Sequence, residues 1–135
     1  MEIDLELAKE QSEKNPVYYC QYAHARICSI LRKASGFRFQ ASGFKALNHQ
    51  SELSLIKQLI KFPEVVEDTA RDYQLQRLPK YALDLATAFH QFYSDCRVIS
   101  EDKELTWDRL GLVLAVKTAL KNTLNLMGIS APEKM

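Results

Sequence analysis

Residues 79–99, "PKYALDLATAFHQFYSDCRVI", decide the fold of this chain. The apolar residues of the stretch recur at steps of three and four: Ala82, Leu85, Phe89, Phe92, Cys96 and Ile99. Because an α-helix turns once in about 3.6 residues, this spacing places them along one side of a helix. Pro79 suits a first helical turn, where backbone N–H groups have no partner inside the helix. The stretch therefore predicts a long helix with one buried side.

A second long helix is predicted at residues 107–127. Thr106 stands where an N-cap oxygen is needed. The apolar side of this helix consists of Leu110, Val113, Val116, Leu120, Leu124 and Met127. Gly128 follows where helices often end on a left-handed residue, and Ile129 supplies the hydrophobic contact that accompanies such an ending.

Proline and capping residues divide the rest of the chain into further helices. Asn15 is the predicted N-cap of a helix that begins at Pro16 and runs to about Ala34. Further helices are predicted at 3–13, at 52–61 after Ser51, and at 63–74. No segment alternates convincingly between apolar and polar residues, as a half-buried strand would. We therefore expect an all-α bundle of about five to six helices, with residues 1–135 as a single domain.

Composition favours a cytoplasmic location without membrane contact. No apolar run approaches the roughly 18 residues that a membrane-spanning helix needs. The start, "MEIDLE", lacks the basic residues and apolar middle of a signal peptide. The three cysteines form an odd number without framework spacing, so reduced thiols are expected.

Charge is distributed unevenly although the formal net charge is only +1. Residues 1–13 carry five acids and one base, whereas residues 14–51 carry no acid at all. The bases of the second region are Lys14, Arg26, Arg32, Lys33, Arg38 and Lys45. A basic field of this kind attracts RNA or another polyanion, and the alternative is a solvated surface that happens to be basic.

The stretch "YYCQYAHARI" at residues 18–27 has two faces when each residue advances the helix by 100°. Cys20, Ala23 and Ile27 share the core side, whereas Tyr22 and Arg26 point away from it. Tyr18 also faces outward, and Tyr19 lies on the border. Aromatic rings interleaved with cations suit unpaired RNA, because rings stack on bases and cations meet phosphates. Cover by another helix explains the same pattern equally well.

Two more sets of aromatic residues can be interpreted either as an RNA contact or as packing within the bundle. In the helix at 79–99, Tyr93, Arg97 and His90 are predicted to share a flank, either as an RNA contact or as a cation packed over a core-edge ring. The loop "ASGFRFQASGFK" offers three phenylalanines that either stack on bases or, as we favour, anchor the loop to the bundle: Phe37, Phe39 and Phe44.

No catalytic or metal motif stands out. Cys20, His24 and Cys28 are spaced by four residues along one helical flank, but the close cysteine pairs of structural zinc sites are absent from the sequence. Small cysteines inside a helical core are much commoner. Gly-rich phosphate loops, nucleophile elbows and H-E-x-x-H are also missing. We therefore expect no metal and no active site within these 135 residues.

Three segments resemble the C-terminal anticodon-binding domain, of the DALR type, in bacterial arginyl-tRNA synthetases. They are "NPVYYCQYAHARICSILRKA" (15–34), "LPKYALDLATAFHQFYSDCRVI" (78–99) and "RLGLVLAVKTALKNTLNLMGISAPEKM" (109–135). Two departures from the family pattern occur. Cys20 stands where valine is usual, and the D-A-L-R string is reduced to Asp108-Arg109-Leu110.

The resemblance implies that the parent is a class I arginine–tRNA ligase, which uses ATP and magnesium. Its ATP-binding signatures do not occur in this sequence, so catalysis is expected in an N-terminal part, which residues 1–14 would connect to the helical bundle at 15–135. The expected partners are arginine tRNA and that catalytic part, in a monomer. The family's anticodon contacts correspond to Tyr19, Tyr22, Tyr93 and Met135, with Arg26 and Arg97 beside them.

The genetic code sharpens this expectation. Every arginine codon has G in the middle, so every matching anticodon has C there. We hypothesise that Tyr22, Tyr93 and Met135 wall a pocket for that unstacked cytosine, with backbone groups near the C-terminus reading its pairing edge. The alternatives are a helical protein-interaction module without RNA specificity and a small enzyme that uses the Cys/His flank.

Overall fold

The computed structural model describes residues 3–37 and 43–135 and contains six α-helices within them. They are α1 (Leu5–Lys9), α2 (Pro16–Lys33), α3 (Gln50–Ile60), α4 (Phe62–Asp72), α5 (Arg77–Asp95) and α6 (Lys103–Leu126). These described residues form no strand, so the prediction of an all-α bundle is confirmed. No helix among them is long and apolar enough to cross a membrane.

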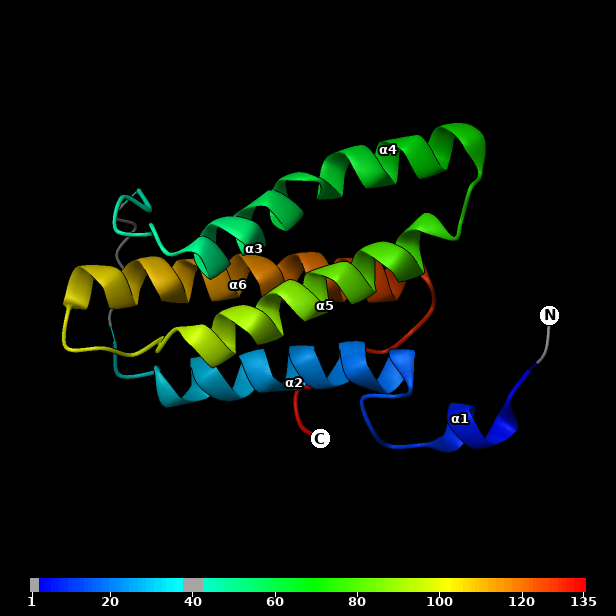
Figure 1. Cartoon of the computed structure of the whole chain (residues 1–135), viewed down its shortest axis with the longest axis horizontal. Helices are drawn as coiled ribbons and strands as arrows, with labels where there is room; N and C mark the ends of the chain where they lie inside the picture. The colour runs from blue at the N-terminus through cyan, green and yellow to red at the C-terminus, as the bar shows by residue number, and fades with distance from the viewer. Residues whose placement is uncertain (1–2, 38–42) are drawn as a thin grey trace.

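Five helices build the bundle, namely the long helices α2, α5 and α6 and the 11-residue helices α3 and α4, and α1 lies off its end (Figure 1). α2, α5 and α6 pack against one another, and α3 continues almost directly into α4 across the opposite side of α5. α2 and α5 run in the same direction, and α6 runs in the opposite direction and packs against both. This arrangement places the outer faces of α2 and α5 side by side.

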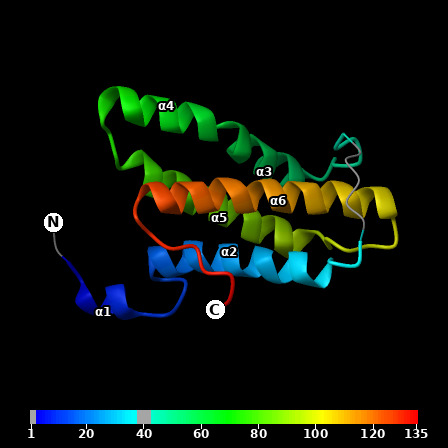
Figure 2. The same ribbon diagram turned by 180° about the vertical axis from the view of Figure 1, so that it is seen from behind.

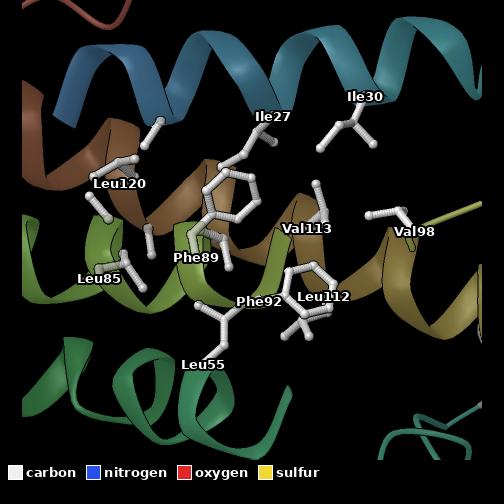
Figure 3. Close-up of a cluster of buried hydrophobic side chains, with 14 of the residues drawn as sticks. Ile27, Ile30, Leu55, Leu85, Phe89, Phe92, Val98, Leu112, Val113 and Leu120 are labelled. Carbon is white, nitrogen blue, oxygen red and sulfur yellow. The ribbon is translucent and has the colours of Figure 1, made fainter. Parts of the chain in front are cut away.

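The core consists of the apolar sides that the periodicity predicts. Ile27 of α2, Phe89 of α5 and Val113 of α6 are fully buried, and Figure 3 shows Phe89 extending toward α2 beside Ile27. Leu55 brings α3 into the same cluster. Burying a side chain of this size contributes about 1.5–3 kcal/mol, so the shared core is the main reason why these helices stay together.

Two predicted helix ends agree with the structure. The Asn15 side chain accepts hydrogen bonds from the backbone N–H groups of Val17 (3.1 Å) and Tyr18 (3.3 Å), so it caps α2. Gly128 adopts a φ of +73°, a left-handed conformation that glycine tolerates best. Ile129 packs against the core after it, as predicted.

Two predicted caps were wrong. Asp102, not Thr106, caps α6, which therefore begins at Lys103. Thr106 is buried inside the first turns, and its hydroxyl bonds to Ser100 and to the carbonyl of Asp102. In α3 the cap is His49 in place of Ser51. A polar turn offers several capping oxygens, and the one that acts depends on how the loop packs.

The boundaries of two helices, α5 and α1, also differ from the prediction. α5 begins at Arg77, two residues before Pro79, because proline is tolerated throughout the first turn. α1 covers only Leu5–Lys9 rather than residues 3–13. No residue of α1 is buried, so tertiary packing does not extend the helix.

Contrary to our expectation, the loop before α3 is not anchored to the bundle by its phenylalanines. Phe37 and Phe44 are 39% and 49% exposed, so neither anchors the loop in the core, and Phe39 lies outside the described residues. Leu47 is buried instead, and the backbone N–H of Ala46 donates to Asp108 at 2.8 Å.

Candidate nucleic-acid interface

A hollow of about 470 Å³ lies between α2, α5 and the C-terminal tail. Its walls include Tyr22 from α2, Tyr93 from α5 and Met135 at the end of the chain. These three side chains are 36%, 41% and 52% exposed, so their apolar surfaces are accessible rather than covered by another helix. The structure thus brings together residues that are far apart in the sequence.

Arg26 fixes the relation between the two tyrosines. Its guanidinium carbon lies 5.0 Å from the centre of the Tyr22 ring and 4.4 Å from the centre of the Tyr93 ring. It also donates to the Tyr22 hydroxyl at 3.1 Å. A guanidinium so close to aromatic faces is attracted by their electron-rich centres. Arg26 therefore links α2 to α5 and leaves positive charge beside both rings.

Further cations surround the same hollow. Arg32, Lys33 and Lys134 contribute to its lining, and all three are exposed. None of them forms a salt bridge within the part of the chain that the structure describes. Aromatic walls with unneutralised cations at the rim are the chemistry that unpaired nucleotides require.

A second hollow, of about 480 Å³, adjoins the first across Tyr22 and Arg26. Its other lining residues are Glu13, Tyr18, Tyr19 and His90. The Tyr18 and Tyr22 rings are nearly parallel, with an interplanar angle of 15° and 6.2 Å between centres. Burial, reinforced by the Arg26 charge, lowers the pKa of His90 to about 4. This imidazole is therefore neutral near pH 7 and adds no charge to the site.

The structure separates two of the predicted site residues from the hollow at Met135. Tyr19 is half-buried, with its ring 4.9 Å from His90 and its hydroxyl 3.3 Å from Thr87, so it belongs to the second hollow. Arg97 lies beyond the end of α5, because the backbone becomes extended at Cys96. It therefore does not follow Tyr93 by one helical turn as predicted. Arg97 contributes to a neighbouring surface that also includes Tyr93.

His90 shares a flank of α5 with Tyr93, as predicted, because both side chains contact Arg26. Its ring also lies close to the rings of Tyr19 and Tyr22. Of the three residues predicted to share this flank, only Arg97 departs from it, because it follows the end of α5.

Sequence reasoning missed how the C-terminal tail is attached. Side chains of α2 form hydrogen bonds with backbone carbonyls of the tail, and His24 contributes from a buried position. Because hydrogen bonds to backbone atoms require no complementary residue in the tail, the sequence pattern carries no signal for them.

The cysteines have the environment of core residues. Cys20, Cys28 and Cys96 are free and buried, and burial raises the pKa of the Cys20 thiol to about 11. A thiol is nucleophilic and binds metals only when it loses its proton, which burial opposes. No group of three or more candidate metal ligands occurs among residues 3–37 and 43–135.

Comparison with known proteins decides the family. Residues 20–135 match the family described as the DALR anticodon binding domain. The chain belongs to this family. It is 49% identical over its full length to an arginine–tRNA ligase of Salinibacter ruber and 50% identical to one of Dehalococcoides mccartyi strain CBDB1, and it covers 25% of each. This DALR domain thus spans about a quarter of the length of these curated relatives.

Solved structures show the same architecture. A Campylobacter jejuni protein assigned as an arginyl-tRNA synthetase superposes on the DALR domain with a TM-score of 0.88 and 34% identity, over 100% of this chain and 30% of that one. The Thermus thermophilus arginyl-tRNA synthetase gives a TM-score of 0.77 and 35% identity, over 87% of this chain and 21% of that one. The resemblance in fold therefore extends over the helices that carry both hollows.

Proposed function

We propose that this DALR domain binds the anticodon loop of arginine tRNA and reads the middle cytosine. The observation that carries the proposal is the hollow that joins Tyr22, Tyr93 and Met135, with Arg26 against both rings. An unstacked pyrimidine fits between aromatic and thioether surfaces, and neighbouring cations suit the phosphates on either side.

The tail offers a means of telling cytosine from other bases. Met135 lines the hollow, so backbone groups of the C-terminal tail lie close to it. Cytosine presents an amino donor beside a ring acceptor on its pairing edge, so backbone acceptors and donors at the end of the chain would complement it. Guanine presents its groups in a different order and is larger.

The wider role follows from the relatives, which are arginine–tRNA ligases about four times as long as this chain. We propose that this domain serves such an enzyme, and that ATP and magnesium act in its catalytic part. The domain itself needs no cofactor for reading a base. A monomer in the cytoplasm, with arginine tRNA and the catalytic part as partners, remains our proposal.

A titration of two RNA hairpins tests the base-reading role. One is the anticodon stem-loop of an arginine tRNA, and the other carries G in place of the middle C. We expect tighter binding of the first, and an affinity that falls as salt rises, because phosphate contacts release counterions. Equal affinity for both hairpins would contradict base reading and would favour a helical protein-interaction module.

Tyr22→Leu removes the proposed stacking surface while keeping an apolar side chain. We expect a loss of about 1–3 kcal/mol in binding the cytosine hairpin, since base–aromatic stacking contributes that amount. Tyr73→Leu is a matched control, because Tyr73 is 82% exposed and lies after α4, outside both hollows. An equal loss in the two variants would refute a specific stacking role for Tyr22.

A further inference from the structure

The last residues of the chain form an extended tail that runs back along α2. Figure 2 shows the tail leaving the end of α6 and crossing the outer side of α2. Helix α6 ends at Leu126, and Gly128 turns the chain with its left-handed φ. From Ser130 onward the tail has no helix of its own, so contacts with α2 determine its path.

Three side chains of α2 bind backbone carbonyls of the tail. Gln21 Nε2 donates to the carbonyl of Ser130 at 3.0 Å, and also reaches the Ser130 hydroxyl at 3.3 Å. His24 Nδ1 lies 2.9 Å from the carbonyl of Pro132. Arg32 Nη1 donates to the carbonyl of Glu133 at 3.1 Å.

These contacts share one side of α2. At 100° per residue, positions 21, 24 and 32 fall within about 80° of one another. The donors therefore form a row along the helix, and the carbonyls of the tail meet them in order from Ser130 to Glu133.

His24 is the contact that fixes the register of the tail. A carbonyl only accepts hydrogen bonds, so His24 Nδ1 must carry the proton that is donated to Pro132. The His24 side chain is 1% exposed, and its Nε2 has no hydrogen-bond partner among the residues that the structure describes. If the tail slipped by one residue, a buried N–H would lose its partner, and an unsatisfied buried donor is costly.

The position of Met135 follows from this register. Met135 lies three residues after Pro132 and reaches the hollow lined by Tyr22 and Tyr93. A terminal residue without such attachment would sample many positions, and ordering it on binding would reduce affinity. A tail that is already fixed avoids that entropy cost.

We propose that Gln21, His24 and Arg32 form a clamp that holds the tail in register and so positions Met135 for base recognition. The part of this proposal that concerns base recognition rests on the proposed function. Gln21 and His24 do not line the hollow, so they act through the tail as positioning residues. Arg32 also lines the hollow and is available to RNA directly, so it is not a clean test of the clamp.

The first measurement needs no RNA. Methyl NMR of the methionines in the full chain reports whether Met135 stays beside the tyrosine rings, because ring currents shift its methyl signal. Gln21→Leu removes the hydrogen-bond donor to Ser130, and His24→Leu removes the buried donor to Pro132. His24→Asn keeps an N–H donor close to the position of Nδ1. Gln58→Leu makes the same change as Gln21→Leu on α3, away from the tail.

The second measurement is a double-mutant cycle with the cytosine hairpin. We expect Gln21→Leu and His24→Leu to weaken binding by about three- to tenfold, the amount that one net hydrogen bond supplies. In a Met135→Ala background the same changes should cost nothing further, because the residue they position is gone. His24→Asn and Gln58→Leu should retain both affinity and the shifted methyl signal.

The clamp would be overturned if Gln21→Leu and His24→Leu left the Met135 methyl signal unchanged. It would also be overturned if their losses of affinity added fully to that of Met135→Ala. If the unaltered chain fails to discriminate between the two hairpins, the proposed function fails instead. The Met135 methyl signal alone then tests the clamp. If both Gln21→Leu and His24→Leu keep the ring-current shift of that signal, the clamp is refuted; if both lose the shift, the clamp is supported.

Discussion

His90 shows how a single residue adjusts the charge of the site. It lies beneath Tyr19 and Tyr22, and its Nδ1 is 3.5 Å from Arg26 Nη1. A second positive charge at this place would be both buried and repelled by the guanidinium. The pKa of about 4 expresses these two costs, of which burial is the larger.

The low pKa of His90 predicts that acid destabilises the fold. The unfolded chain binds a proton near pH 6.5, whereas folded His90 does so only near pH 4. The stabilising effect of the neutral ring is therefore complete above pH 6.5 and is lost as pH falls from 6.5 to 4. At about 1.4 kcal/mol per pKa unit, the loss is on the order of 3 kcal/mol. Urea unfolding at several pH values measures it.

His90→Gln is the variant that isolates this effect. Carboxylates and His24 also titrate in acid, so the informative quantity is the difference between the variant and the unaltered chain. We expect that difference to shrink as pH falls, because only the unaltered chain loses the benefit of a neutral His90. A difference independent of pH would show that His90 does not titrate as its surroundings indicate.

Tyr93 provides a second prediction at this scale. Tyr93→Leu removes the ring beside Arg26, whereas Tyr93→Phe keeps the ring and loses only the hydroxyl. We expect the leucine variant to weaken binding of the cytosine hairpin by about 1–3 kcal/mol and the phenylalanine variant to lose much less. Fluorescence anisotropy of a labelled hairpin measures both. Equal losses would mean that the hydroxyl, and not the ring, makes the contact.

The sequence predicted which tyrosines are exposed better than it predicted their neighbours. Tyr22 and Tyr93 face outward because helical periodicity fixes the direction of each side chain relative to the core. Arg97 was misplaced because α5 ends at Asp95 without a glycine or proline to signal the end. The role of His24 was equally hidden, since its partner is a backbone atom in a tail without periodicity.

At the scale of elements, Asn15 joins two of them with one side chain. Its oxygen caps α2, while its Nδ2 donates to the carbonyls of Ala8 (3.1 Å) and Glu10 (3.0 Å). The residue is 8% exposed, so these bonds compete little with water. Capping explains why "NP" starts a helix here, and the amide explains why α1 stays near it.

Two substitutions separate these roles of Asn15. Asn15→Asp keeps a capping oxygen but removes the N–H donors, so we expect α1 to loosen while α2 remains stable. Asn15→Ala removes both and should cost about 0.5–2 kcal/mol in unfolding free energy. Hydrogen exchange of residues 3–12 reports the first effect, and urea unfolding reports the second. Unchanged exchange in Asn15→Asp would refute the attachment of α1 through this amide.

Helix existence was predictable, whereas several helix ends were not. The periodicity of α5 and α6 extends over many turns, so a few irregular residues do not obscure it. A cap depends on one side chain, and the turn "SEDKELT" contains several that qualify. Asp102 acts as the cap because the hydroxyl of Thr106 bonds to Ser100 and to the carbonyl of Asp102 itself.

At the scale of the whole molecule, a buried ion pair connects α3 to α6. Glu52 of α3 accepts from Arg109 Nε of α6 at 3.0 Å, and these side chains are 1% and 12% exposed. Glu52 also accepts from the backbone N–H of His49 at 2.9 Å. Arg109 Nη1 donates to the carbonyl of Arg97 at 2.6 Å. The pair therefore joins α3, α6 and the segment after α5.

Removing one partner of this pair should destabilise the fold strongly. Glu52→Gln leaves the Arg109 charge buried without a carboxylate, and Arg109→Met leaves Glu52 without its cation. Breaking a buried pair in this way costs about 3–5 kcal/mol, because the remaining charge loses both water and partner. The double variant Glu52→Leu/Arg109→Met should cost less than the sum of the single losses, since no charge is left unpaired.

Urea unfolding of all variants provides the comparison. Lys80→Met is the control, because the pair between Lys80 and Asp84 is exposed and contributes at most about 1 kcal/mol. Additive losses would show that Glu52 and Arg109 act independently and that the connection between α3 and α6 depends on the core alone.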